Sequence, residues 1–281
     1  MTIALSMKVH DGVVLAADSA ATIYQTDAAG AQRRVNIYYN AEKICNLYKG
    51  LPIGFVSWGL GSIGSASITT LAKDLRKRFM GLDAQRGDWT INPGNYNIQD
   101  IAIACRRFFF EEHYIAAFAK TEKKPYLGFV VAGYSSGEDL AEAWEVSITD
   151  GESDPPTLDR PKEKTGFSWF GDPEVITRLV LGFGTGLEDA LKELGVKEDQ
   201  LSKAVDQIRE RLAVDVLPAP MPIKDVIDLA EFLINTTIEF NRYLPGVSTV
   251  GGPVEIAAIT RHEGFKWVRR KKFHDSQINE D

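Results

Sequence analysis

The chain has 281 residues, of which 44% are hydrophobic, and its formal net charge at pH 7 is -7. This length allows one large domain or two small ones, and the acidic balance argues against nucleic acid as a partner because no basic face offsets phosphate repulsion. Two cysteines without metal-binding spacing, Cys45 and Cys105, favour a reducing compartment over a disulfide scaffold. The chain shows no basic, signal-like start and no apolar run of membrane-spanning length, so we expect a soluble, cytoplasmic protein with no membrane partner.

A strand hairpin is predicted at the start of the chain. Residues 3–9 alternate between apolar and polar side chains, which is typical of a strand. Asp11-Gly12 is a common hairpin turn, and a second strand is expected at 13–17, immediately before Asp18. Pairing across this turn brings the first residues of the chain close to Asp18.

The later segments are assigned from the same strand and helix periodicities. Asp172-Pro173 is interpreted as a helix start, with Asp172 as the cap and Pro173 in the first helical position. The other expected elements, in chain order, are a loop or ragged hairpin extension at 19–35, strands at 43–48 and 52–58, helices at 62–82 and after Asn97, strands at 126–134 and 140–148, a loop at 151–165, short helices near 185–194 and 198–213, a long helix from Pro222, and strands at 254–260 and 264–268.

Runs of strands that alternate with runs of helices predict an α+β fold rather than repeated β-α units. A natural arrangement is a four-layer α-β-β-α sandwich, with two antiparallel sheets face to face and helices outside. We expect a single domain over 1–281, with a helical insertion near 185–216 and a short polar tail after about residue 270. The basic run 269–272 is interpreted as a solvated tail, with contact to an acidic neighbour as the alternative.

Thr2 is the first candidate for chemistry. Removal of Met1, which is usual before a small residue, leaves a free α-amine and a hydroxyl on the same residue. Such an amine can act as general base for its own hydroxyl, because it titrates near ~7.7 to 8.0. Taken alone, however, many cytosolic proteins begin with Met-Thr.

Two further residues are expected beside Thr2. Asp18 ends an apolar strand, where it is either a solvated carboxylate or a partner for a cation. Lys43 opens the next strand pair, where it is either an exposed edge lysine or a neighbour that lowers the pKa of the Thr2 hydroxyl and amine. In the second reading of each residue, Asp18 holds Lys43 in place.

Four segments share a pattern with a known family: Thr-Ile-Ala-Leu-Ser at 2–6, Asp-Gly-Val-Val-Leu-Ala-Ala-Asp-Ser at 11–19, Glu-Lys-Ile at 42–44 and Val-Ser-Trp-Gly-Leu-Gly at 56–61. Together they resemble the proteasome β-subunit and HslV-like family, which includes bacterial proteasome homologues and belongs to the Ntn-hydrolase superfamily. The resemblance covers about the first 80 residues and continues more weakly through 130–134 and 251–256. The four-layer sandwich is the fold that this family adopts.

The resemblance implies a role for each matched position. Thr2 is implied as nucleophile and, through its amine, as base; Lys43 tunes both groups and Asp18 orients Lys43. The backbone amide of Gly59 is implied as the oxyanion hole, as a glycine after a strand allows close approach of a substrate. Ser57 and Gly61 flank Gly59 and are expected near the substrate side chain.

The chain departs from the family pattern at two places. Asp172 stands where active members usually carry a Ser, and it serves either as an acceptor for the Thr2 amine or as a helix cap. Val247 and Val250 stand where the family tends to carry an Asp and a Ser. A shifted loop would let Ser248 or Thr249 compensate, so Ser248 and Asp172 are further candidates around the nucleophile.

The leading expectation is a threonine-type peptidase that cleaves polypeptides inside a homo-oligomeric ring or stack of rings, with an ATP-dependent unfoldase as an additional partner. Two alternatives keep the fold: an inactive assembly or scaffold protein, and an amidohydrolase of small molecules. No cofactor and no metal are predicted, because the four histidines are scattered and no phosphate-binding glycine loop is present.

Overall fold

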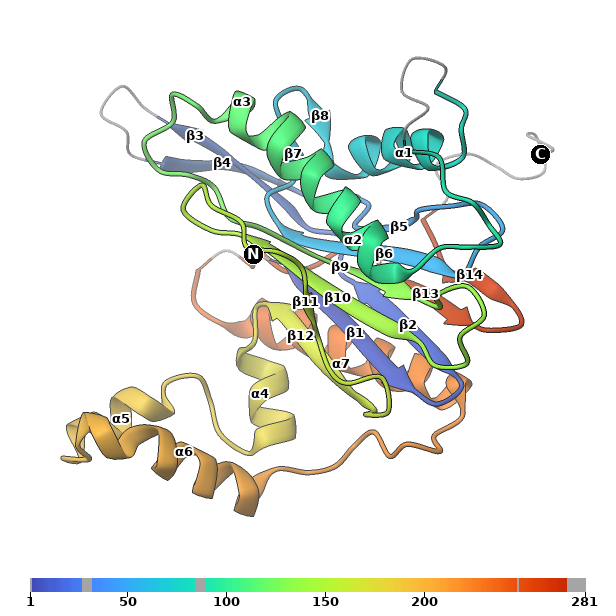
Figure 1. Ribbon diagram of the computed structural model, residues 1–281. Coiled ribbons are helices and arrows are strands. Elements are labelled where there is room, and N and C mark those ends of the chain that lie inside the picture. The colour runs from blue at the N-terminus through green and yellow to red at the C-terminus, as the bar shows by residue number, and fades with distance from the viewer. Residues whose placement is uncertain (1, 27–31, 84–88, 247, 272–281) are drawn as a thin grey trace.

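The computed structural model describes residues 2–26, 32–83, 89–246 and 248–271, and two stacked antiparallel sheets form its centre (Figure 1). The first sheet has the strand order β12-β1-β2-β13-β14, and the second has the order β11-β10-β9-β6-β5. The strands of the first sheet are β1 (Ile3–Val9), β2 (Gly12–Ala17), β12 (Gly166–Gly171), β13 (Glu255–Thr260) and β14 (Gly264–Arg269). Those of the second are β5 (Ile44–Asn46), β6 (Ile53–Gly59), β9 (Leu127–Gly133), β10 (Glu142–Ile148) and β11 (Thr157–Leu158).

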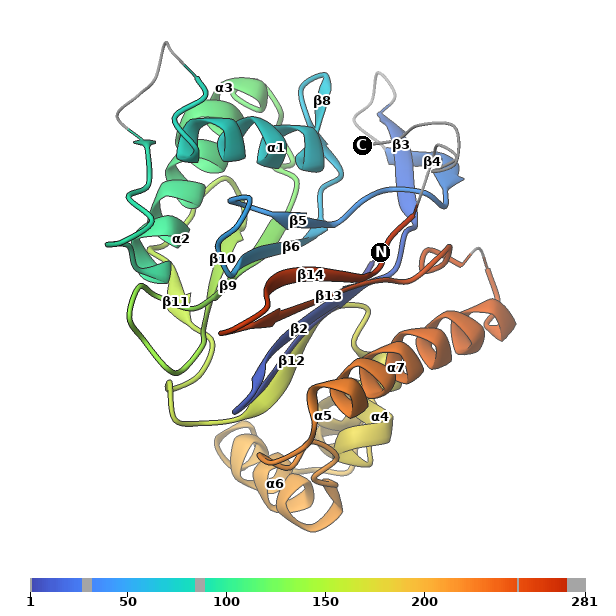
Figure 2. The same cartoon turned by 90° about the vertical axis from the view of Figure 1, so that its right-hand side faces the viewer.

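Helices cover the outer face of each sheet (Figure 2). The second sheet is covered by α1 (Ile68–Phe79), α2 (Ile98–Arg106) and the π-helical segment η2 (Arg107–Tyr114), which α3 (Ile115–Ala117) continues. The first sheet is covered by α4 (Glu174–Leu181) and the long helix α7 (Ile223–Tyr243). No helix in the described part of the chain is both long enough and apolar enough to cross a membrane.

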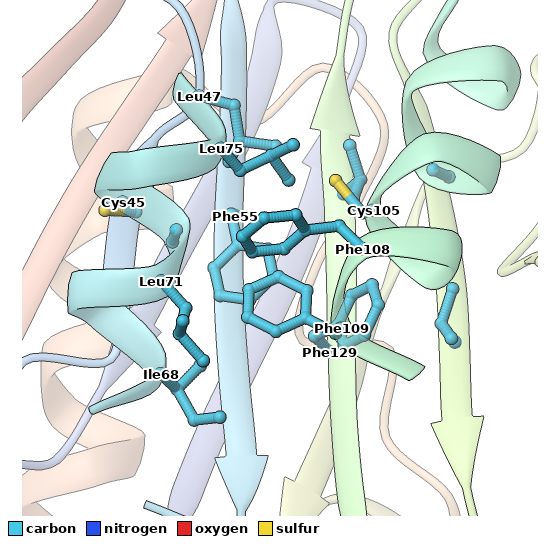
Figure 3. Close-up of a cluster of buried hydrophobic side chains, with 14 of the residues drawn as sticks. Cys45, Leu47, Phe55, Ile68, Leu71, Leu75, Cys105, Phe108, Phe109 and Phe129 are labelled. Atoms are coloured by element: carbon cyan, nitrogen blue, oxygen red, sulfur yellow. The ribbon is translucent and has the colours of Figure 1, made fainter. Parts of the chain in front are cut away.

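Three buried apolar clusters lie between the four layers. The outer cluster under α1 and α2 contains stacked aromatic rings, with the centroids of Phe55 and Phe109 5.4 Å apart (Figure 3). The cluster between the sheets contains Leu15, and the cluster beneath α7 contains Leu5. The predicted α+β class and the four-layer α-β-β-α order are therefore confirmed.

The terminal hairpin, residues 2–18, lies in the interior of the first sheet. Every residue of β1 and β2 is buried, because one face packs on α7 and the other on the second sheet. The hairpin turns at His10 and Asp11, one residue earlier than predicted, and Gly12 begins β2 opposite Val9. A side chain at Gly12 would overlap the carbonyl oxygen of Ile259 on β13, so this strand position requires glycine. The pairing of Ala4 with Ala17 leaves Thr2 and Asp18 at the open end of the hairpin.

Helix α1 begins later than predicted. Residues 62–67 form a short hairpin of β7 (Ser62–Ile63) and β8 (Ala66–Ser67), which turns at Gly64 with a φ of 60°. The Ser67 hydroxyl then accepts the N–H of Thr70 at 3.1 Å and caps the helix. The apolar spacing of 68–79 was assigned correctly, but the glycine turn before it excludes a helix from residue 62.

Two further regions differ from expectation. Where a loop or ragged hairpin extension was expected, β3 (Ala21–Thr26) and β4 (Gln32–Tyr38) form a two-stranded ribbon that projects from the sandwich (Figure 1). No strand was predicted at β12, although its side chains alternate between the two apolar clusters on either side of the sheet. This missed strand pairs with β1 and so borders Thr2.

The helical excursion, residues 183–213, stands away from the sandwich at its lower end (Figures 1 and 2). It contains α5 (Leu187–Glu193) and α6 (Glu198–Leu212), which lie within the helical stretch expected near 185–216. Leu201 is the one buried residue of these two helices, and Leu194 between them is 82% exposed. The excursion therefore contributes little to the core.

Candidate active site

Asp18, directly after β2, is the centre of a buried hydrogen-bond cluster. Its side chain is fully buried, and both carboxylate oxygens have partners. Oδ1 accepts the N–H of Ile3 at 3.1 Å and the Lys43 Nζ at 2.5 Å. Oδ2 accepts the N–H of Ala20 at 3.1 Å and that of Gly251 at 3.0 Å. One carboxylate thus fixes the start of β1 and holds the lysine beside it.

Lys43 precedes β5 in the second sheet and reaches across to the first. Its side chain is 9% exposed, and its carbonyl accepts the N–H of Ser57 at 3.0 Å. Its own N–H donates to Glu255 Oε2 at 3.2 Å. Burial lowers the pKa of Lys43, whereas the charge of Asp18 opposes this shift. A buried lysine of lowered pKa is better able to give and take a proton at neutral pH than an exposed one.

Thr2 is buried at the edge between β1 and β12. Its carbonyl accepts the N–H of Asp172 at 2.7 Å, which continues the pairing of Ile3 with Gly171. Gly171 has a φ of 94°, and a side chain there would overlap the Thr2 carbonyl oxygen. Glycine is required at this position because the chain approaches Thr2 so closely.

The prediction that Asp172 caps a helix is wrong. Helix α4 begins at Glu174, its capping residue is Pro173, and no side chain caps it. Asp172 instead directly follows β12, and its N–H continues the pairing of that strand by donating to the Thr2 carbonyl. Its side chain is buried, and its carboxylate accepts no hydrogen bond from any described residue. A carboxylate that no described residue contacts by a hydrogen bond therefore follows the strand that pairs with the candidate nucleophile.

Gly59 ends β6 at the same end of the sandwich as Lys43. It has a φ of 84°, and a side chain would overlap the carbonyl oxygen of Tyr126, so the position requires glycine. Ser57 is buried two residues earlier and bonds to the Lys43 carbonyl. Gly61 is exposed, with open space where a side chain would point. The structure thus places Ser57 beside Lys43, while the roles of Ser57, Gly59 and Gly61 stay predictions.

Aromatic stacking connects the Gly59 strand to the strand beside Thr2. The rings of Trp58 and Phe170 are parallel within 13°, with their centroids 3.9 Å apart. The indole N–H of Trp58 also donates to the Tyr126 hydroxyl at 2.9 Å. This contact joins β6 of the second sheet to β12 of the first, next to the site.

The segment before β13 also borders the site. The Ser248 hydroxyl donates to the carbonyl of Val250 at 2.7 Å, so it is engaged within its own segment. Val250 is buried, and the following Gly251 supplies one of the N–H groups that bind Asp18. The expectations for Met1 and Val247 lie outside the described residues and stay predictions.

Sequence reasoning missed Gly251, Glu255 and Lys271. The Lys271 side chain is only 12% exposed and lies 3.5 Å from Glu255 Oε2, so the solvated-tail interpretation of 269–272 is wrong at this residue, while Lys272 lies outside the described residues. Glu255 left a usable signal, because it is a charged residue in the otherwise apolar strand 254–259. Lys271 left none, since basic runs near a terminus are usually solvated.

Other candidate groups lie away from this cluster or are chemically unsuited. Burial raises the pKa of Cys45 to about 11 and also raises that of Cys105, which keeps both thiols protonated at neutral pH. A cavity of about 370 Å³ between α1 and α2, with Trp89 and Asp100 in its lining, opens on the outer side of the second sheet. It is remote from Thr2, so the chemistry is assigned from the hydrogen-bond cluster and not from the cavity.

Comparison with known proteins assigns no family to the chain. No family model matches the chain, and no curated protein matches it. Among solved structures, it is similar to a Gly-1 mutant of Anbu from Hyphomicrobium sp. strain MC1, with 14% identity over 96% of this chain and 86% of that one and a TM-score of 0.48. The expected membership of the proteasome β-subunit and HslV-like family is therefore corrected: the likeness found is distant, and at this level it assigns neither a family nor an activity.

Proposed function

We propose that the chain, once Met1 is removed, is an N-terminal-threonine hydrolase that cleaves amide bonds of peptides. The observation that carries this proposal is the Asp18 carboxylate, whose Oδ1 binds both the backbone N–H of Ile3 and the Nζ of Lys43. Asp18 thereby holds the side chain of the buried Lys43 close to the backbone of Ile3, the residue that follows Thr2. An ordinary strand end needs neither a buried lysine nor a carboxylate with four donors.

The proposed reaction begins when the Thr2 hydroxyl attacks an amide carbonyl and its proton passes to the Thr2 α-amine. Lys43 favours this step, because a nearby positive charge lowers the pKa of a hydroxyl. The N–H of Gly59 is proposed to bind the oxyanion of the tetrahedral intermediate. The α-amine then protonates the leaving amine, and an ester on Thr2 remains until water hydrolyses it.

Asp172 is proposed to bind the α-amine in its protonated state. Its support is a carboxylate that accepts no hydrogen bond from any residue the structure describes, together with the backbone bond from the Asp172 N–H to the Thr2 carbonyl. An ammonium group released at Thr2 would give this carboxylate a charged hydrogen-bond donor. This contact would orient the amine toward the hydroxyl of the same residue.

The test starts with the intact mass of the purified protein. We expect Met1 to be absent. We also expect one molecule of a peptide epoxyketone, which reacts with the hydroxyl and the α-amine of an N-terminal threonine, to add to the protein at Thr2. Thr2→Ser should keep the adduct and Thr2→Ala should lose it, and both variants keep a small second residue for Met1 removal. Thr70→Ala changes an exposed threonine of α1 and serves as the matched control.

Peptide and small-amide libraries then separate the competing functions. Turnover of peptides that disappears in Thr2→Ala supports the proposal. Turnover of small amides alone would indicate an amidohydrolase of small molecules. Retention of Met1, or a processed protein inert to the epoxyketone and to both libraries, would overturn the proposal in favour of a scaffold.

A further inference from the structure

A second buried lysine lies behind Lys43. Lys271 follows β14, and its Nζ donates to the Ser19 hydroxyl at 2.6 Å and to the carbonyl of Ala41. The same Nζ is 3.5 Å from Glu255 Oε2. It therefore contacts three separate segments: the turn after β2, the loop before β5 and the first residue of β13.

Each of these segments touches the Asp18–Lys43 pair. Ser19 is the neighbour of Asp18, and its carbonyl accepts the N–H of Ala41 at 3.0 Å. Glu255 pairs with Ala17 in the sheet and accepts the Lys43 N–H. In the first sheet β13 pairs with β2 and β14 pairs with β13, and the pairing of Arg269 with Ile256 brings the end of β14, and so Lys271, close to Glu255.

Glu255 shows why a cation is needed there. Its side chain is fully buried, and Oε1 has no hydrogen-bond partner. Burial raises the pKa of Glu255, and the charge of Lys271 is the largest influence that opposes the shift. An ionised carboxylate in this position depends on Lys271, because a lone buried charge is strongly disfavoured.

We propose that Lys271 is a positioning residue for the threonine site: it clamps Ser19, Ala41 and Glu255 together and so fixes Lys43 against Asp18. This inference rests on the proposed function for its catalytic meaning, whereas the clamp itself is independent of it. Lys271 contacts no reacting atom in this scheme. It acts through the backbone on either side of Lys43 and through its charge.

The charge of Lys271 shifts the pKa of Lys43 in a definite direction. Burial is the largest cause of the lowered pKa of Lys43; among nearby charges Lys271 lowers this pKa further, while Asp18 and Glu255 raise it. Glu42 also faces the clamp from the loop before β5, with Lys73 of α1 2.6 Å away as its partner. Loss of Lys271 should therefore raise the pKa of Lys43, and loss of the Glu255 charge should lower it.

The experiment follows the ionisation of Lys43 by NMR of protein labelled with ¹³C at lysine Cε, with the signal assigned through Lys43→Arg. Lys271→Met should move the Lys43 titration midpoint to higher pH, and Glu255→Gln should move it to lower pH while keeping an acceptor for the Lys43 N–H. Lys271→Arg keeps the charge and should stay near the parent. Lys266→Met, an exposed position on β14, is the matched control and should change nothing.

Epoxyketone labelling of Thr2 provides the second readout. The alkaline limb of the pH–rate profile, where Lys43 loses the positive charge that favours the Thr2 hydroxyl, should follow the two opposite shifts, and Lys271→Met should slow labelling by roughly tenfold to a hundredfold at neutral pH. A merely structural loss would slow both variants without moving their profiles in opposite directions. If Lys271→Met does not fold, Lys271→Met/Glu255→Gln replaces it, with a smaller upward shift expected because Lys271 outweighs Glu255 at Lys43.

The outcomes separate this inference from the proposed function. Midpoints that stay unmoved, or that move in the same direction in Lys271→Met and Glu255→Gln, overturn the clamp even where Thr2 is labelled. Opposite midpoint shifts in a protein that the epoxyketone does not label uphold the clamp and overturn the hydrolase.

Discussion

The terminal hairpin and the helical excursion are held by the fold in opposite ways. Every residue of β1 and β2 is buried, and the carboxylate at the end of the hairpin has four donors. In α5 no residue is buried, and in α6 Leu201 alone is. Charged groups can be held in an exact arrangement only where the surrounding backbone has no freedom to relax, so the candidate chemistry lies in the hairpin.

The largest effect is expected from Asp18→Asn. Asparagine keeps the shape but leaves the buried ammonium of Lys43 without a counterion, which costs about 3–5 kcal/mol of stability. Epoxyketone labelling of Thr2 should fall by roughly a hundredfold or more, since the amide no longer holds the lysine in place. Chemical denaturation and the labelling rate measure the two effects.

The matched change in the excursion is Asp199→Asn, at an exposed position in the first turn of α6. We expect a stability change within about 0.5 kcal/mol and a parental labelling rate. Equal effects of the two substitutions would show that the contrast between hairpin and excursion is wrong.

A second pair removes the same side chain from each region. Leu15→Ala opens a cavity between the two sheets, where Leu15 is fully buried, and should cost about 2–5 kcal/mol. Leu194→Ala, at a residue 82% exposed, should cost less than about 0.5 kcal/mol. The denaturation midpoints of the two variants give the comparison, and a loss at Leu194 as large as that at Leu15 would mean that the excursion is buried in an assembly.

Local patterns sufficed for the hairpin. Alternation over 3–9, the turn signal at Asp11-Gly12, which misses the observed turn by one residue, and the strand before Asp18 act within a few residues of one another, so the pairing that sets Thr2 beside Asp18 could be read directly. Lys43 was placed near them through the resemblance of Glu-Lys-Ile at 42–44 to the proteasome β-subunit and HslV-like family, and no local pattern indicated its position.

Features that depend on contacts between distant segments were not predicted from the sequence, and the reason is physical. Asp172-Pro173 carries the local signal of a helix cap, but Gly171 at positive φ and the bond to Thr2 assign Asp172 to the strand end. Lys271 lies in a run that locally favours solvent, and its burial depends on Glu255, which only sheet pairing brings close. Tertiary contacts, rather than propensity, decide such positions.

A small effect is expected even from removing the excursion altogether. Its two ends meet in the fold, because the N–H of Val214 donates to the carbonyl of Val180 at 2.9 Å. Residues 183–213 can therefore be replaced by a Gly-Ser linker of about four residues, since short connections are cheap to close. The deletion also removes the two hydrogen bonds that Thr185 donates to Glu174, and both of these lie near the surface.

We expect this deletion to keep the stability within about 1 kcal/mol of the parent and the Thr2 labelling rate within about twofold, as measured by denaturation and intact mass. The control inserts the same linker after Gly186 and keeps both helices, which separates an effect of the linker from an effect of the loss. A deletion variant that folds and labels normally but changes its mass in solution would assign the excursion to assembly. One that fails to fold, while the control folds, would show that α5 and α6 support the sandwich despite their exposure, and the contrast with the terminal hairpin would no longer hold.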